Sequence, residues 1–452
     1  MGWKRQAQAR VAQTLAGFSL IGLIGCDSPP NELARIKTTG VLQIAVRAVP
    51  ERAPHTPVHL ERELTERFAQ WLGVEPRFIV HTTPAHAFGR VAAGGADLAA
   101  TADGLPARFQ ETLLTGPTIR SVERVVVYRR KHRRPRTASE LEERTLLIAE
   151  GAAAEDEIPL LPSESVEIDR RRDTPVLLEA VWRKQAGLST ATTEYLSSLQ
   201  LRYPELARAF SLRRNVPVAW VFRRGTDDTL RRAAIHFMNH MRRTGELSRV
   251  IDRHLAHLRS FDYVSVRRFI RAMRKRLPLY RADFESWARE YGLDWRWLAA
   301  VGYQESHWDP KAVSPTGVRG IMMLTKPTAK GLGVDRNNPQ ESIRGGARYL
   351  AELTKRLPPG IPKHERPWFT LVSYHLGPRH LTGVRTLTAR SGGDPDRWRD
   401  VEARLPWLRR SAWYSTVPSG RARGHETVHY VRNVRRYHDI LRWHLPDPPP
   451  GK

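Results

Sequence analysis

The sequence predicts an α/β domain of two lobes followed by a mainly α-helical domain. Between residues 41 and 258, short runs rich in Val, Ile and Ala alternate with longer amphipathic stretches, a pattern typical of parallel sheets covered by helices. The alternation runs through two consecutive sets, which indicates two lobes with a cleft between them. After residue 262, apolar residues recur at helical spacing and strand signals are nearly absent. We therefore expect domains at residues 41–262 and 263–452.

The predicted strands of the first domain are short, mostly apolar runs bounded by polar or glycine-containing segments. They span residues 41–46, 77–80, 97–101, 122–128, 146–149, 188–192 and 217–222. The predicted helices of this domain carry apolar residues on one face. They span residues 58–72, 85–93 and 176–185, with two more between 228 and 257.

The second domain is predicted to consist of amphipathic helices joined by short loops. The helices span residues 266–277, 282–291, 325–331, 341–357, 367–375 and 428–443, besides one that passes through Gln304. Proline and glycine at positions 358–360 mark a connector between two of them.

The chain is strongly basic. Its 452 residues include 74 Lys and Arg against 47 Asp and Glu, a formal net charge of +27. Such a balance indicates either a solvated basic surface or an acidic partner such as nucleic acid, anionic lipid or an anionic polymer. Nucleic-acid binding rests on the charge alone, and the export signal described next argues against it.

The first 25 residues have the features of a bacterial export leader. A basic start precedes the mostly apolar segment 11–25, which is too short to span a bilayer comfortably. Cys26 is the only cysteine, so no intrachain disulfide is possible. Residues 23–26, Leu-Ile-Gly-Cys, resemble the bacterial lipobox. That resemblance implies cleavage after residue 25 and lipid attachment at Cys26. An ordinary signal peptide or a short anchor is the alternative.

The lipobox resemblance also implies a location. No segment after Cys26 is apolar and long enough to cross a membrane. We expect the rest to be exported and soluble, with residues 26–40 as a tether to a lipid anchor. The expected place is the periplasmic face of the outer membrane. Asp27 resembles an inner-membrane retention signal, which leaves that membrane as the alternative.

A carboxylate closes the apolar face of one predicted helix of the second domain. Asp294 is a suitable N-cap, and residues 295–304 contain no proline. Leu298, Val301 and Glu305 then share one face of the helix. Glu305 therefore either caps or pairs with another group, or it is a proton donor that is kept partly dry.

The segment after this helix favours the second interpretation. Residues 314–320 are rich in turn-forming and small residues, and glycine allows a backbone to come close to a ligand. The apolar run of residues 321–324 follows. A glutamate, a loop of small residues and an apolar wall together suit a groove that binds a polymer.

Four short motifs resemble the goose-lysozyme-like lytic transglycosylase domain. They occur in the family's order and cover about the last 190 residues. The motifs are Glu305-Ser306, Gly320-Ile321-Met322-Met323, Ser373-Tyr374-His375-x-Gly377, and Glu426-Thr427 with Tyr430-Val431. The resemblance implies that the domain cleaves the glycan strands of peptidoglycan.

This resemblance implies chemistry with one carboxyl group. The usual cleavage of a β-1,4 glycosidic bond needs two, but Asp309 and Asp335 lie in turn-forming segments and are expected to be structural. In lytic transglycosylases one glutamate, here Glu305, first protonates the leaving oxygen. It then takes the proton from the C6 hydroxyl of the same sugar, which attacks C1 and gives a 1,6-anhydro product. Such a group needs a pKa near the working pH, which burial raises.

The resemblance also assigns residues that hold the sugar. Ser314 is expected to bond to the acetamido group or to Glu305, with turn capping as the alternative. Four further residues are expected to line the groove or support Glu305, with a place in the core as the alternative. They are Met322, Met323, Tyr374 and Tyr430. His375 stands where the family usually has asparagine, and Met323 where many relatives have glutamine.

We expect no cofactor and no metal. His425 and His429 are four residues apart, but no His-Glu-x-x-His pattern accompanies them. Glu426 between them is better explained by the transglycosylase motif.

The first domain resembles the periplasmic solute-binding proteins of amino-acid transport, family 3. The residues that carry this resemblance are Gly95-x-Asp97-Leu98-x-Ala100, Pro106-x-Arg108, and the segment 224–247. In that family the arginine matching Arg108 grips the ligand carboxylate as a bidentate fork. Glu194 is the candidate for binding the ligand amine. A surface arginine is the alternative for Arg108, and the ligand is expected to be an amino acid or a muropeptide.

The order of leader, solute-binding-like domain and transglycosylase domain resembles the membrane-bound lytic murein transglycosylases of the F type. Two other activities remain open. A lysozyme-like hydrolase would use the same fold and add water to the sugar. A non-catalytic ligand-binding lipoprotein would result if the second domain had lost activity, for which His375 and Met323 give an argument.

Overall fold

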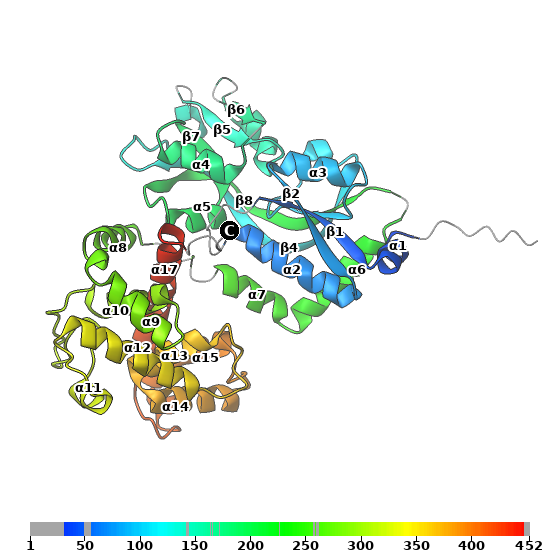
Figure 1. The fold of residues 1–452 in the computed structure, drawn as a ribbon. Helices are drawn as coiled ribbons and strands as arrows, with labels where there is room; N and C mark the ends of the chain where they lie inside the picture. The colour runs from blue at the N-terminus through cyan, green and yellow to red at the C-terminus, as the bar shows by residue number, and fades with distance from the viewer. Residues whose placement is uncertain are drawn as a thin grey trace, which may run out of the picture.

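The computed structural model describes residues 31–48, 56–141, 144–162, 164, 166–170, 172–225, 227–255, 258 and 262–446. The predicted leader, the lipobox and Cys26 lie outside these residues. Within the described segments, no helix has the length and apolar character needed to cross a membrane. The sheet lies in the N-terminal half, and helices make up the C-terminal half (Figure 1). The predicted fold class is therefore confirmed.

The strands of the described residues form one eight-stranded sheet in the order β2-β1-β3-β8-β4-β7-β5-β6. Their bounds are β1 Val41–Arg47, β2 Glu75–His81, β3 Leu98–Ala100, β4 Leu113–Arg129, β5 Leu146–Ala149, β6 Val166–Asp169, β7 Leu188–Thr192 and β8 Leu206–Arg223. The pairs β1–β2, β1–β3, β5–β6 and β5–β7 are parallel, as the alternating pattern predicts.

The two lobes are joined by β4 and β8. These strands are 17 and 18 residues long and pair with each other along most of their length. Near Leu113, β4 and β8 lie beside β3 of the first lobe (β1–β3). Near Arg124, β4 instead pairs with β7 of the second lobe (β5–β7). The sequence predicted only residues 122–128 of β4 and 217–222 of β8, which lie near the C-terminal end of each strand. The earlier residues of both strands mix polar and apolar side chains, and register shifts interrupt the pairing.

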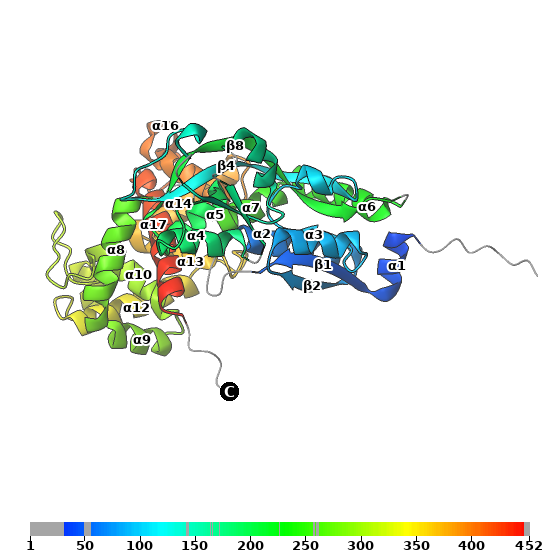
Figure 2. The ribbon, with the colours of Figure 1, turned by 90° about the horizontal axis from the view of Figure 1, so that it is seen from above.

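The helices of the N-terminal half pack on the faces of this sheet or, in the case of the last one, on two of the other helices (Figures 1 and 2). Their bounds are α1 Glu32–Thr39, α2 Pro57–Leu72, α3 Pro84–Ala92, α4 Thr174–Trp182, α5 Thr193–Gln200, α6 Thr229–Arg243 and α7 Glu246–Leu255. Helix α5 and strand β6 were not predicted. Strand β6 is an edge strand without a fully buried residue, so it has no continuous apolar run to reveal it.

Helix α1 occupies residues that were predicted to be part of a tether. Its N-cap Asn31 accepts a hydrogen bond from the Ala34 backbone N–H at 2.8 Å. Ile36 is completely buried, and Gly40 ends the helix with a φ of 69°. The cap, the buried isoleucine and the terminal glycine make residues 32–39 part of the folded domain.

The C-terminal half contains the helices α8 Tyr263–Lys275, α9 Arg281–Glu290, α10 Trp295–Ser306, α11 Lys326–Leu332, α12 Pro339–Lys355, α13 Arg366–Leu376, α14 Pro378–Arg390, α15 Trp398–Arg404, α16 Ser411–Tyr414 and α17 Gly424–His444. Helices α14 to α16 were not predicted. Helix α17 packs along α10 and continues toward the sheet-containing half (Figures 1 and 2).

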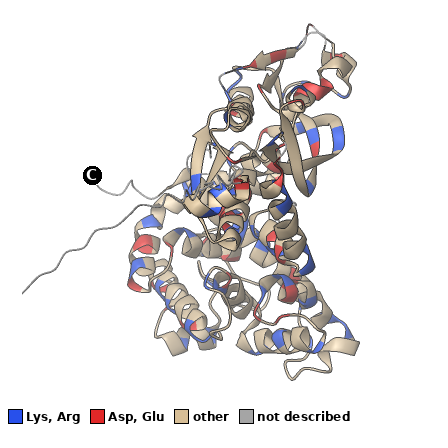
Figure 3. Ribbon diagram, turned by 90° about the vertical axis from the view of Figure 1, so that its right-hand side faces the viewer, with Lys and Arg blue, Asp and Glu red and all other residues tan. Residues whose placement is uncertain are grey.

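The two halves contact each other through α7, α8 and α17. The Arg435 guanidinium of α17 donates to the Arg253 carbonyl of α7 at 3.1 Å. The guanidinium of Arg130, just after β4, lies 4.4 Å from the centre of the Tyr263 ring at the start of α8. Lys and Arg residues occur in both halves (Figure 3).

Candidate active site

Helix α10 begins and ends within the residues that the motif requires. The Asp294 carboxylate accepts from the Arg296 backbone N–H at 2.9 Å, which confirms the predicted cap. The helix ends at Ser306, because His307 and Trp308 have φ values of 54° and 56°. Glu305 therefore lies in the last turn of α10.

Two hydrogen bonds fix this last turn. The Ser306 hydroxyl donates to the Ile321 carbonyl at 2.7 Å and so joins α10 to the loop that follows. Trp308, 1% exposed, donates from its indole N–H to the Ala299 carbonyl at 2.8 Å. The chain after Glu305 is thereby held against its own helix, and this limits the movement of the carboxyl group.

The loop after α10 is organised by Ser314 and Gly320. The Ser314 hydroxyl accepts from the Val318 backbone N–H at 3.0 Å and lies 3.0 Å from the Thr316 hydroxyl. Gly320 has a φ of 87°, and a Cβ there would lie 1.9 Å from the Arg336 carbonyl oxygen. Only glycine fits at this position. The turn-capping alternative thus describes the Ser314 side chain in this structure.

The two methionines differ in position. Met322 is completely buried, and its side chain lies against Gly302 of α10 and Gly346 of α12. Its carbonyl accepts from the Tyr374 hydroxyl at 2.7 Å. Met323 is partly exposed and has a φ of 48°. Of the two methionines, Met323 is therefore the one with exposed surface.

Tyr430 of α17 holds Glu305. Its hydroxyl donates to Oε1 of the Glu305 carboxyl at 2.5 Å, and the tyrosine is 4% exposed. Burial, and after it the charge of Glu305, raises the pKa of Tyr430 and of Tyr374 well above the ordinary value. Both phenols therefore stay protonated and can act as hydrogen-bond donors.

The Glu305 carboxyl is surrounded by protein, although the residue as a whole is partly exposed. Burial raises its pKa from 4.5 to about 7, and the hydrogen bond from Tyr430 partly opposes this rise. No ion pair of Glu305 occurs among the described residues. A carboxyl group without a cation therefore sits where it is partly protonated at neutral pH.

His375 lies beside this pair. Its ring stacks on that of Tyr430, with 4.4 Å between the ring centres and 26° between the planes. Although His375 is an exposed residue, the protein packed around its ring lowers the pKa of the imidazole. Because its pKa lies below the ordinary value, the imidazole is mostly neutral at pH 7, so it can donate and accept one hydrogen bond each, as an asparagine amide does.

The other candidate acids have local partners. The Asp309 carboxylate accepts from the Lys311 backbone N–H at 3.0 Å, and the Asp335 carboxylate from that of Asn337 at 2.9 Å. Both therefore stabilise turns, as the sequence predicts. Within the described ranges, no group of three or more His, Cys, Asp or Glu is arranged to hold a metal ion.

The two residues predicted to bind a ligand in the first domain are each paired with another charged residue. Arg108 is 47% exposed and donates to the Glu155 carboxylate at 2.5 Å. It lines an open depression of about 840 Å³. Glu194, at the start of α5, accepts from Nε of Arg120 at 2.9 Å.

Three buried arginines bridge the lobes. Arg47 at the end of β1 is bound by both oxygens of Asp173, the N-cap of α4. Arg120 on β4 contacts Glu61 of the first lobe and Glu194 of the second. Arg124 on β4 similarly contacts Asp103 and Glu157, a residue of the 3-10 helix Ala153–Leu160. The sequence prediction did not include these ion pairs. The only indication of them in the sequence was an arginine inside or at the end of an apolar strand, where a charge must be paired. Each pair connects the lobes, so these ion pairs hold them together.

Comparison with known proteins identifies the family. Residues 283–393 match the transglycosylase SLT domain, a range that includes Glu305 and Tyr374 but not Tyr430. The chain is 38% identical over 426 residues to the membrane-bound lytic murein transglycosylase F of Salmonella arizonae. That similarity covers 92% of this chain and 82% of the relative. The chain belongs to the membrane-bound lytic murein transglycosylase F family. Family membership accounts for both halves, because the similarity extends over nearly the whole chain.

Solved structures match the N-terminal half. A mutant of ArgBP from T. maritima aligns with 49% of this chain and 98% of its own, at 15% identity and a TM-score of 0.44. The solute receptor for L-cysteine of Neisseria gonorrhoeae aligns with 49% of this chain and 93% of its own, at 18% identity and a TM-score of 0.44.

Proposed function

We propose that this protein is a lytic transglycosylase that cleaves the MurNAc-β-1,4-GlcNAc bond of peptidoglycan and leaves 1,6-anhydromuramoyl ends. The observation that carries the proposal is the environment of Glu305. Its carboxyl is buried without a cation, has a pKa of about 7 and accepts a hydrogen bond from Tyr430. One such group can act as an acid and then as a base at neutral pH.

In the first step, protonated Glu305 gives its proton to the glycosidic oxygen. The bond between C1 of the muramoyl sugar and this oxygen breaks, and the GlcNAc residue leaves with a hydroxyl at C4. The substrate acetamido oxygen stabilises the positive charge at C1, a role that the second carboxylate has in other glycosidases. The turn roles of Asp309 and Asp335 support this assignment.

In the second step, the Glu305 carboxylate takes the proton of the C6 hydroxyl of the same muramoyl sugar. The C6 oxygen forms a bond to C1, which closes the 1,6-anhydro ring. Glu305 regains its proton, and no water is consumed. Tyr430 donates to the carboxyl in both steps, because the raised pKa keeps its phenol protonated.

We assign the sugar contacts to residues around this pair. Ser314, Met323, Tyr374 and His375 contact the glycan strand. Met322 acts from the core, because its carbonyl positions the Tyr374 hydroxyl. His375 replaces the amide of the family's usual asparagine with an imidazole whose lowered pKa keeps it mostly neutral at pH 7.

We propose that residues 41–262, together with helix α1, form a ligand-sensing domain and that residues 263–452 form the enzyme. We also propose that Cys26 carries a lipid at the outer membrane. Arg108 and Glu194 are the proposed contacts of an amino acid or muropeptide. Each already has a partner of opposite charge, so a ligand must displace Glu155 or Arg120 to reach them. This competition predicts weak binding of single amino acids.

Product analysis tests the proposed activity. Purified sacculi are digested with the protein, and the released muropeptides are weighed by mass spectrometry. Anhydromuramoyl ends are expected, whereas a lysozyme-like hydrolase gives reducing ends that are heavier by one water. No release from sacculi would indicate a non-catalytic binding protein. Glu305→Gln serves as the matched inactive control.

A further inference from the structure

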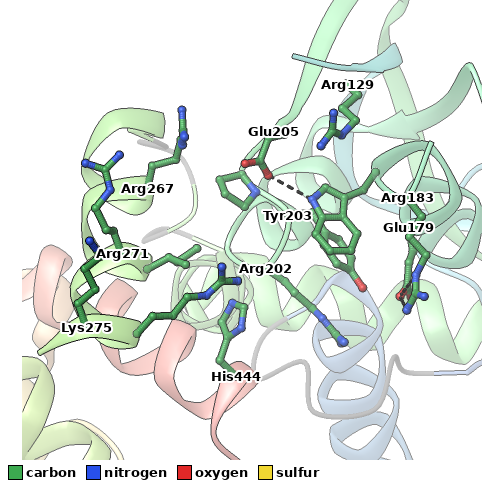
Figure 4. Close-up of a pocket in the computed structure, with 14 residues that line it drawn as sticks. Arg129, Glu179, Arg183, Arg202, Tyr203, Glu205, Arg267, Arg271, Lys275 and His444 are labelled. Atoms are coloured by element: carbon green, nitrogen blue, oxygen red, sulfur yellow. Dashed lines mark hydrogen bonds and ion pairs between the residues drawn. The ribbon is translucent and has the colours of Figure 1, made fainter. Parts of the chain in front are cut away.

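A basic cavity lies between the second lobe and the helical half. Its volume is about 590 Å³, within the range of sites that bind small molecules. On one side are the end of β4, helix α4 and the segment between α5 and β8, and on the other are α8 and the end of α17. Figure 4 shows Arg267, Arg271 and Lys275 of α8 on one side of the cavity.

The two carboxylates that line this cavity each have a partner of their own. Glu179 forms an ion pair with Arg183 at 2.7 Å, and Glu205 accepts from the Trp182 indole N–H at 3.2 Å. Six other cations line the cavity, and none forms an ion pair with a described residue. They are Arg129, Arg202, Arg267, Arg271, Arg274 and Lys275. Positive charges gathered without counter-charges favour an anion between them.

Two buried groups on opposite sides of the cavity have unused hydrogen-bonding capacity. Within the described part of the chain, Nε of Arg129 and Nε2 of His444 have no hydrogen-bond partner. Burial, together with the charges of Arg202 and Arg274, lowers the pKa of His444 to about 4. The imidazole is therefore neutral and can still donate or accept one hydrogen bond.

We propose that this cavity binds a soluble anion with two or more carboxylate or phosphate groups. Arginines at 267, 271 and 274 follow one face of α8, and guanidinium groups bind both kinds of oxyanion bidentately. Arg129 and Arg202 of the second lobe approach the anion from the opposite side. A concave site with cations on two sides fits a small polyanion better than a flat membrane surface.

Occupation of this site joins the second lobe to α17. That helix carries both His444, which lines the cavity, and Tyr430, which holds Glu305. A bound anion therefore stabilises the observed arrangement of the lobes and the helical half.

The test uses the full chain in detergent. Citrate and pyrophosphate are titrated by calorimetry and in thermal unfolding, with acetate at matched ionic strength as the monovalent control. We expect citrate, pyrophosphate or both to bind and raise Tm, and acetate to have no such effect. Binding of citrate alone identifies a carboxylate site, and binding of pyrophosphate alone a phosphate site.

Two double variants with the same change of net charge test whether the anion binds in this cavity. Arg271→Glu with Arg274→Glu changes two exposed side chains that line it, and we expect affinity to fall at least about tenfold. Arg243→Glu with Arg289→Glu makes the same change of net charge at exposed residues outside it and is expected to leave affinity within about twofold. Circular dichroism checks that both fold. Absence of binding by citrate and pyrophosphate, or equal loss in both variants, would overturn the proposal.

Discussion

Buried acids in the two halves of the molecule have different kinds of partner, a charged arginine in one half and a neutral tyrosine in the other. Asp173 and Glu157 lie between the lobes, and each binds a buried arginine. Glu305 in the helical half is instead bound by the neutral phenol of Tyr430. All three are held in dense protein surroundings. The comparison shows that the partner of a buried acid decides whether it connects elements or exchanges a proton.

The physical reason is the balance between desolvation and attraction. A guanidinium offsets the cost of burying a carboxylate, so the ionised pair persists and its removal leaves a charge without a partner. A phenol donates only one hydrogen bond, which offsets part of that cost. Burial therefore prevails at Glu305 and raises its pKa to about 7.

Glu305→Gln removes the acid that exchanges a proton, and it has the largest expected effect on activity. The amide keeps the shape of the side chain but has no acidic proton to give. Because general acid–base catalysis contributes about 10²–10⁴-fold, release of muropeptides from sacculi should fall by at least about a hundredfold. Activity above a tenth of wild type would refute the assignment of Glu305.

Asp173→Asn tests the structural role of a buried acid that is paired with an arginine. It leaves Arg47, whose side chain is 1% exposed, without its counter-charge. We expect the free energy of unfolding to fall by about 3–5 kcal/mol in denaturant titrations. Glu352→Gln is the control, because its partner Arg348 is 47% exposed and such pairs contribute about 0.3–0.5 kcal/mol. Equal losses in the two variants would contradict a role of Asp173 in holding the lobes together.

The stability of wild type should itself depend on Glu305. Its folded-state pKa is raised, so the protonated form stabilises the fold below pH 4.5, and this contribution is lost as pH rises through about 7. Between pH 5 and 9, wild type should lose on the order of 3 kcal/mol relative to Glu305→Gln. The two unfolding curves should therefore separate with rising pH. Parallel curves would show that the carboxyl is solvated.

Tyr430→Phe removes only the hydroxyl group that donates to Glu305, and it has the smallest expected effect of these variants. It removes the hydrogen bond that lowers the Glu305 pKa, so this pKa should rise further by about one unit. The first step needs protonated Glu305, and the alkaline limb of kcat/KM should move to higher pH by the same amount. The pH profile distinguishes this role from a merely structural one, which would lower the rate without moving the limb.

Local features of the active site could be predicted from the sequence. The Asp294 cap, the helical spacing and the apolar face placed Glu305 near the end of a helix, because these depend on residues a few positions apart. The motifs also placed Tyr430 near the site. They left open whether it bonds to sugar or to Glu305, since the two residues are 125 positions apart.

Long-range partners were decided by the tertiary structure alone. Arg47 and Asp173 are 126 positions apart, and no local pattern relates an arginine at the end of one strand to the cap of a later helix. The same holds for the cavity, where α8 meets the second lobe. The sequence determined which residues are apolar, capping or charged. Packing determined which charges became buried together, because desolvation and pairing depend on neighbours in space.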